Sequence, residues 1–404
     1  MNRPRLVVTL PAGIAGRDAR AFAARARALG ADLLELRDDL VDPAALDGNV
    51  LASELPLLLA ARGGLGFPAS WPAALRDHPL GGHAGASVVS LHSAAPLAPD
   101  QALATWNAAA LGPEVLIKHV EPLGDDPTTW MRLLTTQQRL RGRFGDRVTV
   151  LATGAWALPF RALLAAHNAL EFVAVAAETA SAAGQRLLED AARSGHSDAP
   201  RRALIGSHIA HARSPRVHEQ PFDRWDVPQD APVGALIDAV RAHYVGFAVT
   251  APFKRVLAAH VGSSLPAVNT LVRSATGWDA FNTDVDGARA ALDRARMTEL
   301  TVLGDGGAAA PLRLGARGAV RVLRAADAGG RHVGGDVAWT WPAHVEPPAG
   351  LSLAGARVLV IAYGPPARVV ASRIRALGGE PVLAGATWFV AQARVQRELW
   401  RRAT

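Results

Sequence analysis

Lys118 and Lys254 are the only lysines in a chain of 404 residues that holds 43 lysine and arginine residues in total. Arginine therefore fills almost every position that needs only a positive charge. A guanidinium stays protonated in proteins, whereas an ε-amine can lose its proton, attack a carbonyl or relay a proton. Each lysine lies in its own half of the chain. The composition predicts two sites with amine chemistry, against the alternative that both lysines survive an arginine bias by chance.

In the first half, polar residues interrupt apolar, strand-like runs near their carboxyl ends. Lys118 lies in VLIKH and His92 in VVSLH, and the others are Glu35, Arg37, Asp39 and Arg62. A lysine among apolar neighbours is desolvated, which favours the neutral, nucleophilic amine. With a histidine as acid and base and arginines to hold a carboxylate, these residues predict Schiff-base chemistry on a keto acid. The alternative is an ion pair between Glu35 and Arg37 and a hydrogen-bonded core histidine.

In the second half, three short polar clusters each end an apolar run, and together they predict one cleft. Its candidate residues are Ser214, Thr250, Lys254, Asn269, Asn282 and Asp284. Lys254 and Asp284 can pair so that an amine and a carboxylate exchange a proton with a hydroxyl or a ketone. The alternative is a surface salt bridge between two turns.

The segment VLGDGGAA predicts a dinucleotide-binding loop. A strand at 300–304 runs into the small residues Gly304, Gly306, Gly307, Ala308 and Ala309. Such residues allow a tight turn and the close approach of a pyrophosphate to a helix N-terminus. A second strand, 319–323, ends at Arg324, where a cofactor 2′-phosphate would lie, while Asp327 nearby leaves NAD open beside NADP.

The elements that must position these residues alternate regularly in the first half. Periods of two and 3.6 residues predict strands at 5–11, 31–37, 56–61, 87–92, 114–120, 147–153 and 170–176, and helices at 17–29, 43–54, 98–110, 127–144, 156–167 and 184–194. Repeated βα units imply a parallel sheet. So many βα units without a nucleotide-binding motif favour a closed barrel. The catalytic residues of such a barrel gather at the carboxyl ends of its strands. We count about seven units, not eight.

The first half resembles the type I 3-dehydroquinate dehydratases over most of residues 5–190. DLLELRDD looks like that family's D-x-x-E-x-R-x-D, VVSLHS its histidine strand, VLIKHV its Schiff-base lysine strand, and SAAGQ its S-A-P-G-Q closure. The resemblance implies that Lys118 forms an imine with the substrate's C3 ketone, and that His92 moves the C2 proton and then protonates the departing hydroxyl. The implied substrate ligands are Glu35, Arg37, Arg62, Arg161, Ser181 and Gln185. The family has a further βα unit with an acidic strand between Arg62 and His92, where we predict none.

Residues 203–400 resemble the shikimate dehydrogenases. The matching segments are GSHIAHARSPRVHE, AVTAPFK, AVNTL, FNTDVDG, VLGDGGAA and GATWFVAQARVQRELW. The resemblance implies Lys254 and Asp284 as the catalytic pair. It further implies an NADPH site at the loop 304–309 and Arg324, and substrate ligands at Ser214, Thr250, Asn269, Asn282 and Gln392. Departures from the family pattern occur at Ala212, Glu219 and Ala248.

The predicted fold is α/β, with a (β/α) barrel-like domain, an α/β substrate domain and a short Rossmann domain. The predicted boundaries are 1–194 for the barrel, 195–202 for a linker, 203–298 for the substrate domain, 299–380 for the Rossmann domain and 381–404 for a C-terminal helix. The two families catalyse consecutive reactions. The resemblance therefore implies a bifunctional shikimate-pathway enzyme that dehydrates 3-dehydroquinate to 3-dehydroshikimate and reduces it to shikimate with NADPH. Two alternatives stay open, namely that only the reductase half is active, or that the chain is a non-catalytic metabolite-binding or interaction protein.

The composition excludes several other classes. The chain has no cysteine, so disulfides and thiolate chemistry are excluded, and we expect no metal. The net charge of +7 comes from dispersed arginines in the second half, which fits small anionic substrates better than nucleic acid. No signal-peptide pattern and no apolar run of 18 residues occur, so we expect a soluble cytoplasmic protein without a membrane partner. A homodimer stays open.

Overall fold

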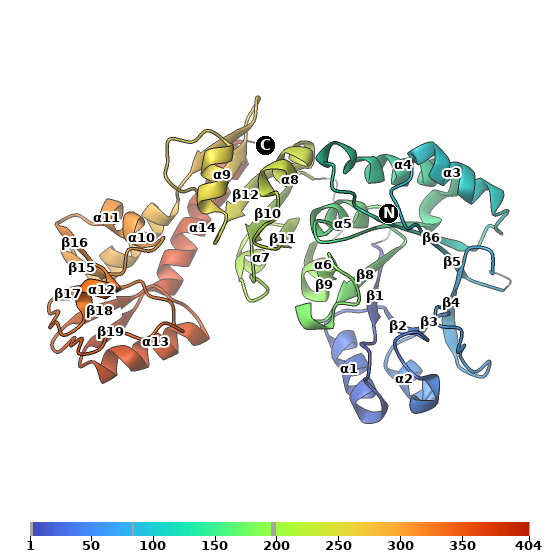
Figure 1. Cartoon of the computed structure of the whole chain (residues 1–404), viewed down its shortest axis with the longest axis horizontal. Coiled ribbons are helices and arrows are strands. Elements are labelled where there is room, and N and C mark those ends of the chain that lie inside the picture. Colours follow the sequence, from blue (N-terminus) through green and yellow to red (C-terminus); the bar gives the residue numbers. More distant parts are fainter. Residues whose placement is uncertain (1–2, 83–84, 195–198, 404) are drawn as a thin grey trace. The chain divides into compact units, whose positions relative to one another are not determined.

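The computed structural model describes residues 3–82, 85–194 and 199–403 (Figure 1). The chain divides into two compact units. The first contains Met1–Pro215 and Glu219–His260, and the second contains Arg216–His218 and Val261–Thr404. Part of the predicted linker, 195–198, lies outside the described residues, and its last two residues begin a strand. The predicted domain boundaries stay predictions.

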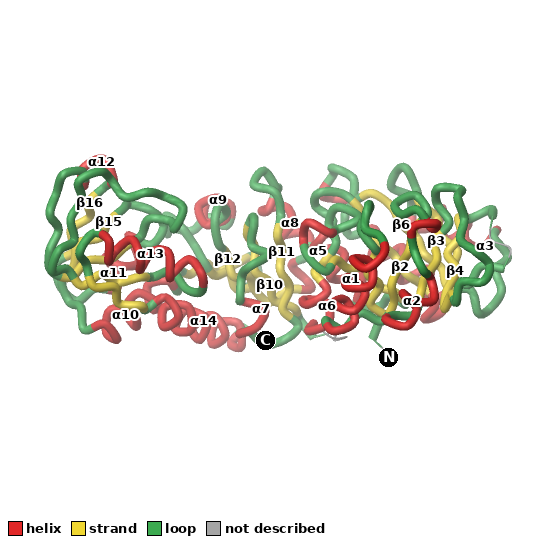
Figure 2. The backbone as a smooth tube through the Cα atoms, turned by 90° about the horizontal axis from the view of Figure 1, so that it is seen from below, coloured by secondary structure: helices red, strands yellow, loops and turns green. Residues whose placement is uncertain are grey.

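A parallel sheet runs through the first unit in the order β7-β6-β5-β4-β3-β2-β1-β8, followed by the short β9 (Arg186–Leu187). Its main strands are β1 (Arg5–Thr9), β2 (Leu33–Arg37), β3 (Leu57–Ala60), β4 (Ala73–Pro79), β5 (Val88–His92), β6 (Leu116–Pro122), β7 (Val148–Thr153) and β8 (Leu170–Ala174). All seven predicted strands are present, which confirms the α/β fold class. The eighth, β4, corrects the predicted count, because it fills the place where no unit was predicted (Figure 2).

Strands β7 and β8 meet through Asn168, which closes the sheet. The Asn168 side chain accepts a hydrogen bond from Val150 N at 2.8 Å and donates one to Val150 O at 3.0 Å. The main-chain nitrogen of Ala169 adds a bond of 2.8 Å to Val148 O. The amide side chain therefore stands in for a ladder pair at the seam.

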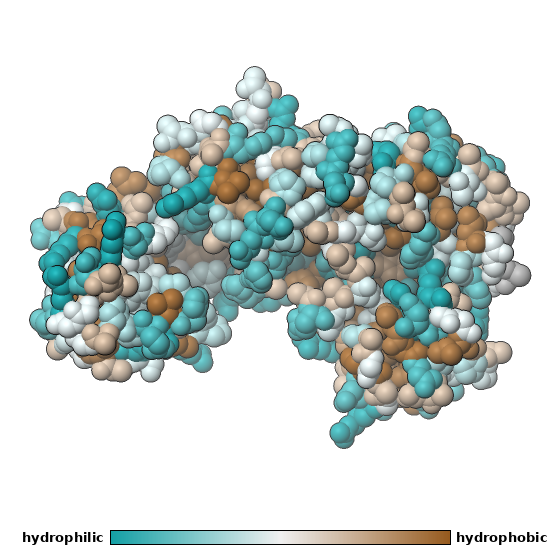
Figure 3. Space-filling model, in the orientation of Figure 1, coloured by the Kyte–Doolittle hydropathy of each residue, from teal (hydrophilic) through white to brown (hydrophobic). Residues whose placement is uncertain are grey.

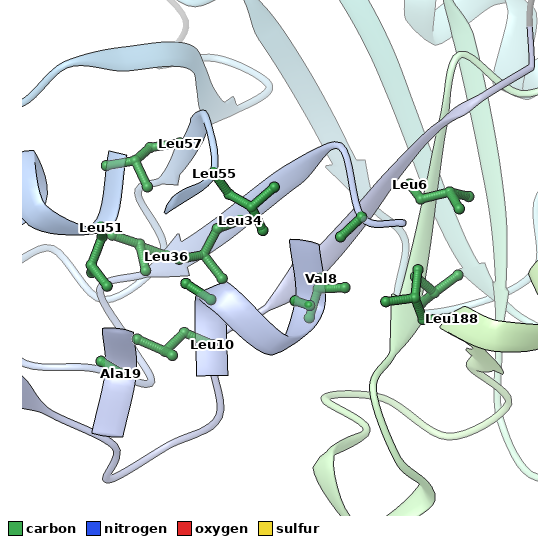
Figure 4. Packing of buried hydrophobic residues seen from close by; sticks show 14 of the residues in the cluster. Leu6, Val8, Leu10, Ala19, Leu34, Leu36, Leu51, Leu55, Leu57 and Leu188 are labelled. Atoms are coloured by element: carbon green, nitrogen blue, oxygen red, sulfur yellow. The ribbon is translucent and has the colours of Figure 1, made fainter. Parts of the chain in front are cut away.

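Alternate residues of the strands face two different layers. Leu6 and Val8 of β1 and Leu34 of β2 pack against the helices, and Figure 4 shows them with Leu51 and Leu188 in one apolar cluster. The residues between them face the inside of the barrel, where the buried apolar side chains are Val7, Leu33, Leu58, Ala60, Leu75, Val88, Val120, Leu151, Leu170 and Phe172. Successive side chains of a strand point to opposite faces of the sheet. The position of a polar residue along its strand therefore determines whether it faces the barrel interior or the helices.

Helices cover the outer face of this sheet, and among the described residues none follows β3 or β4. They are α1 (Gly16–Ala28), α2 (Gly48–Glu54), α3 (Pro99–Ala108), α4 (Arg132–Phe144), α5 (Leu158–Ala165) and α6 (Leu188–Ser194). In α1 the alanines Ala19, Ala23 and Ala26 are buried, while Asp18 in the first turn and arginines in the last turn complement the helix dipole. The predicted helices 43–54 and 127–144 are too long, because each range begins with a separate 3-10 turn, Pro43–Ala45 or Pro127–Thr129, before α2 or α4 starts.

The first unit continues with three parallel strands in the order β11-β10-β12. They are β10 (Arg201–Gly206), β11 (Phe222–Asp226) and β12 (Tyr244–Val249), with the short helices α8 (Val233–Ala239) and α9 (Lys254–His260). The short helix α7 (Ser214–Val217) begins in this unit, and its last two residues are assigned to the second. Loops at the carboxyl ends of β10 and β12 carry the predicted polar clusters of this region. A Cβ on Gly206 would come within 2.5 Å of Thr250 Cγ2, so these two loops pack closely because residue 206 is glycine.

The second unit contains an antiparallel pair and a separate parallel sheet. The pair is β13 (Thr270–Arg273) and β14 (Trp278–Phe281), and the sheet order is β16-β15-β17-β18-β19. The sheet strands are β15 (Leu300–Leu303), β16 (Val320–Leu323), β17 (Asp336–Trp339), β18 (Arg357–Val360) and β19 (Glu380–Leu383), and the helices are α10 (Asp284–Ala295), α11 (Ala309–Gly315), α12 (Ala325–Ala328), α13 (Pro365–Ala376) and α14 (Gly385–Arg402). Helices α10 and α14 lie side by side (Figure 2). The order of strands reverses at β15, so β15 and β17 flank the switch point at which such sheets bind ligands.

Apolar and polar residues are interspersed on the face shown in Figure 3. Over the described part of the chain, no helix combines the length and the apolar character that crossing a membrane requires.

Candidate active sites

Lys118 lies on β6 with its side chain inside the barrel, and only 4% of the residue is exposed. Its Nζ donates a hydrogen bond of 2.7 Å to Asp77 Oδ2 and a longer one of 3.4 Å to Glu35 Oε1. The amine also lies 4.1 Å from the centre of the Phe172 ring. The amine is therefore desolvated, as predicted, but it is held by two carboxylates.

Asp77 is a functional candidate that the sequence analysis missed. It lies on β4, its side chain is fully buried, and it accepts a second hydrogen bond of 2.8 Å from Arg62 Nη2. Burial alone would raise the pKa of Asp77, but the charges of Lys118 and Arg62 outweigh it and hold the pKa below the ordinary value. Asp77 stands on the strand where the resembled family has an acidic strand. The alternation of buried and more exposed positions that ALRDHP allows was the sequence signal that could have indicated this strand.

Glu35 is held in place by a short series of hydroxyl groups. Thr9 Oγ1 donates to Glu35 Oε2 at 2.6 Å, and Ser181 Oγ donates to Thr9 Oγ1 at 3.2 Å. Ser181 in turn accepts from Gln185 Nε2 at 3.2 Å. The structure thus connects the predicted residues Ser181 and Gln185 to Glu35 through Thr9, which was not predicted, and Glu35 contacts Lys118 directly.

His92 ends β5 on the same face as this cluster, two residues after Ser90, whose partner on β6 is Lys118. Although the residue is exposed to solvent, partial desolvation of its ring and the nearby charges of Arg62 and Lys118 lower the pKa of His92 to about 4. The described residues offer its ring no hydrogen-bond partner. His92 is thus a neutral imidazole at pH 7 that is able to accept a proton.

Arg37 and Arg62 lie around this cluster in different ways. Arg37 forms a two-point pair with Asp39, with distances of 3.0 and 2.6 Å. The loop that begins at Arg62 is fixed by Asp38, which accepts hydrogen bonds from the main-chain nitrogens of Arg62 and Gly63 at 2.5 and 2.6 Å. The alternative ion pair between Glu35 and Arg37 does not occur as a direct contact among the described residues. Both side chains are instead engaged by other groups.

Arg161 is not brought to the Lys118 cluster. It lies on α5, fully buried, and its Nη2 donates a hydrogen bond of 2.8 Å to Phe172 O. Desolvation lowers the pKa of Arg161 to about 10, with Glu171 opposing and Arg186 adding to the effect. Glu171 alternates with the inward-facing Phe172, so Arg161 lies in the layer between sheet and helices. Its role as a substrate ligand stays a prediction.

In the second half of the chain, the predicted residues fall into both compact units. Ser214, Thr250 and Lys254 belong to the first unit, where Ser214 is buried at the start of α7 and Lys254 is half-buried at the start of α9. Asn269, Asn282, Asp284 and Gln392 belong to the second.

Asn269 organises the predicted residues of the second unit. Its Oδ1 accepts hydrogen bonds from Thr283 N at 2.8 Å and from Thr270 Oγ1 at 2.9 Å, and its Nδ2 donates to Gln392 Oε1 at 3.1 Å. Gln396, one turn further along α14, donates to Asn269 O at 3.2 Å. The hairpin and α14 are therefore joined through this buried amide.

Asp284 begins α10 and is buried. Its Oδ1 accepts a hydrogen bond of 3.2 Å from Trp388 Nε1, and its main-chain nitrogen donates to Asn282 Oδ1 at 3.2 Å. Trp388 lies against Gly287, where a Cβ would come within 2.7 Å of the indole ring. The carboxylate is thus oriented by an indole that the sequence analysis did not single out.

The loop after β15 makes a tight turn at Gly304. Gly304 has a φ of +102°, and a Cβ there would lie 2.6 Å from Thr340 Oγ1 and 2.8 Å from the Trp341 ring, so only glycine fits. A Cβ on Gly306 or Gly307 would meet no atom within 4 Å, and Ala308 and Ala309 lead into α11. Arg324 at the end of β16 is exposed and pairs with Asp305 at 3.1 Å. The main chain of the loop is therefore open to a phosphate group, with a guanidinium nearby.

Known proteins similar to this chain carry the names of both families. No family model matches the chain. The shikimate dehydrogenase (NADP(+)) of Anaeromyxobacter dehalogenans is 38% identical over 126 residues, which cover 26% of this chain and 45% of the relative. That of Syntrophobacter fumaroxidans is 36% identical over 131 residues, covering 28% and 45%. The chain thus spans about half the length of these curated relatives.

Two solved structures are also similar. The dehydroquinate dehydratase and shikimate dehydrogenase of S. pombe AroM is 18% identical with a TM-score of 0.35, covering 99% of this chain and 96% of that one. The shikimate 5-dehydrogenase of Thermus thermophilus in complex with NADP(H) and shikimate is 23% identical with a TM-score of 0.40, covering 50% and 99%.

Proposed function

We propose that this chain is a bifunctional enzyme that dehydrates 3-dehydroquinate to 3-dehydroshikimate and reduces that product to shikimate with NADPH. The observation that carries the proposal is the buried amine of Lys118 inside a parallel barrel, within 2.7 Å of Asp77 and near the neutral imidazole of His92. The reductase half is supported by the curated relatives, which are named shikimate dehydrogenases (NADP(+)).

In the first reaction, Lys118 attacks the C3 ketone of 3-dehydroquinate and forms an imine with loss of water. The ammonium must first give up a proton, and Asp77 is the acceptor closest to Nζ among its hydrogen-bond partners. Neutral His92 then removes the C2 proton and returns a proton to the departing hydroxyl, while Glu35 and Gln185 hold the substrate. Hydrolysis of the imine releases 3-dehydroshikimate and restores the amine.

In the second reaction, Lys254 and Asp284 exchange a proton with the substrate oxygen that becomes a hydroxyl. Ser214, Thr250, Asn269 and Gln392 hold the substrate. NADPH supplies the hydride when it is bound. The residues around Gly304 fit a dinucleotide, because the loop is open above Gly306 and Gly307 and Arg324 offers a charge for a 2′-phosphate.

A second candidate function is that of a reductase alone, in which the barrel around Lys118 does not catalyse the dehydration. The observation that favours it is the double ion pair of Lys118, since two carboxylates within 3.4 Å engage the amine that would have to attack the ketone. The position of Arg161 outside the cluster favours it as well.

Two assays separate these candidates. Borohydride added with saturating 3-dehydroquinate should reduce the imine and leave a covalent adduct, which peptide mass mapping should assign to Lys118. Absence of an adduct would leave the reductase alone. NADPH oxidation on addition of 3-dehydroshikimate tests the second half independently.

A further inference from the structure

A buried ionic cluster joins the strand β11 to the end of a barrel segment. Asp223 on β11 is fully buried and accepts two hydrogen bonds from Arg201, at 2.6 and 2.7 Å, and one from Tyr244 Oη at 2.8 Å. Arg186 Nη2 reaches the same carboxylate at 3.3 Å. Burial alone would raise the pKa of Asp223, but Arg201 and Arg186 outweigh it and lower the pKa, so the carboxylate is ionised at neutral pH.

Arg186 ends the segment that carries Ser181 and Gln185. Its Nη1 donates to Glu171 Oε1 at 2.7 Å and its Nη2 to Ser194 Oγ at 2.7 Å, so the guanidinium is held on the barrel side as well. Immediately before it, Gln185 and Ser181 bond to each other twice, at 2.8 and 3.2 Å. The segment is thus a closed turn whose far end is tied to Asp223.

The same segment leads to the amine inside the barrel. Ser181 Oγ donates to Thr9 at 3.2 Å, Thr9 donates to Glu35 at 2.6 Å, and Glu35 Oε1 lies 3.4 Å from Lys118 Nζ. Contacts therefore continue without a break from Gln185, next to Arg186, to Lys118.

Packing alone does not hold this segment from the side of β11. A cavity of about 350 Å³ separates it from the loops that follow β10 and β11. Its polar lining residues include Gln185, Arg186, Asp190, Arg224 and Asp226. On the side of β11, the ionic anchor at Arg186 therefore supplements the pairing of β9 with β8 in fixing where Ser181 and Gln185 lie.

We propose that Asp223, which lies outside the barrel strands, is a positioning residue for the Lys118 site, because it anchors Arg186 and thereby fixes Ser181 and Gln185. The proposal deepens the proposed dehydratase function and rests on it. It makes the region of β10 to β12 a structural part of the first active site as well as a carrier of reductase residues.

The test compares Asp223→Asn with Tyr244→Phe in the full chain. Both changes remove a contact to the same buried cluster, but only the first removes one of the two carboxylate charges, Asp223 and Glu171, that hold Arg186. Deuterium exchange of residues 177–187 should rise in Asp223→Asn and stay at the parent level in Tyr244→Phe. The KM for 3-dehydroquinate should rise on the order of tenfold in Asp223→Asn, as for a lost charged anchor, while kcat/KM for 3-dehydroshikimate stays within about twofold.

Unchanged exchange and KM in Asp223→Asn, or equal losses in both reactions, would overturn the proposal. If Asp223→Asn does not fold, Arg186→Met tests the same contact from the other side with the same expectations. The double variant Arg186→Met/Asp223→Asn should lose no more than the larger single loss, because both changes remove one anchor; additive losses would contradict this. A parent protein without a borohydride adduct would refute the dehydratase function itself, whereas the exchange measurement would still decide whether the anchor exists.

Discussion

Lys118 is enclosed by groups of its own compact unit, whereas Lys254 and Asp284 belong to different units. Around Lys118, the partners Asp77 and Glu35 come from strands about 40 and 80 positions away in the chain, and both are buried. The candidate residues near Lys254 instead follow one another in short motifs. Weak marking in the sequence therefore does not prevent residues from assembling within one unit, and strong sequence motifs do not imply that their residues belong to one unit.

The largest expected effect concerns the enclosed lysine. Lys118→Met should abolish the borohydride adduct and lower the rate of 3-dehydroquinate dehydration by at least about a thousandfold, because a covalent nucleophile is lost. Mass mapping and enone absorbance measure the two quantities. Reduction of 3-dehydroshikimate should continue, which serves as the control for folding. An adduct of normal yield in Lys118→Met would place the imine on another residue.

The second lysine should affect the other reaction. Lys254→Met should lower kcat for 3-dehydroshikimate reduction about 10² to 10⁴-fold, since a proton relay is removed. Arg255→Met, one residue further along α9 and exposed, is the matched control and should react at the parent rate. Initial rates of NADPH oxidation compare the two variants with the parent. Equal rates in Lys254→Met and the parent would exclude the proton relay.

Stability distinguishes a buried cluster from a surface pair. Asp77→Asn should lower the free energy of unfolding by about 3 kcal/mol, because it removes the buried charge that Lys118 and Arg62 share and leaves only Glu35, at 3.4 Å, beside Lys118. Asp39→Asn, at the more exposed pair with Arg37, should cost less than about 1 kcal/mol. Urea unfolding measures both. Similar losses in the two variants would mean that burial adds nothing to the Asp77 pair.

The pH dependence of this difference follows from the lowered pKa of Asp77. A carboxyl group whose folded pKa lies below its ordinary value of 3.8 contributes its full stability above that value and loses it as the pH falls through the folded pKa. The gap between the parent and Asp77→Asn should therefore be constant from about pH 5 to 8 and shrink below about pH 4. A gap that grew on acidification would contradict the sign of the shift.

The smallest effect concerns the dinucleotide loop. Gly306→Ala should weaken NADPH binding about tenfold without destabilising the fold, because the added Cβ meets no protein atom within 4 Å and obstructs only a ligand. Gly142→Ala on α4, equally open, is the control and should bind like the parent. Quenching of NADPH fluorescence gives both affinities. Unaltered affinity in Gly306→Ala would remove the loop from the proposed cofactor site.

The sequence predicted the apolar strands well, because a run such as VVSLH reports burial directly. It missed β4, whose seven residues AALRDHP include two charges, a histidine and a proline. Asp77 is buried only because Lys118 and Arg62 neutralise it, and those partners lie 41 and 15 positions away. The sequence pattern alone does not show such distant compensation.

Strand β11, FDRWD, was missed for the same physical reason. Asp223 and Arg224 are buried, and their charges are met by Arg201, Arg186 and Asp190. The motifs around Asn269 and Asp284 were recognised because the residues that define each motif lie close together in the sequence. Their supporting contacts to Gln396 and Trp388 on α14, more than 100 positions away, were not.

The most direct test of the bifunctional proposal starts from 3-dehydroquinate and NADPH with the intact chain alone. The parent should consume NADPH and form one shikimate for each NADPH oxidised, as measured by absorbance and mass spectrometry. Lys118→Met should form none from 3-dehydroquinate, yet form shikimate from 3-dehydroshikimate at the parent rate. If the parent accepts only 3-dehydroshikimate, the enclosed lysine is a structural ion pair and the two-step account is wrong.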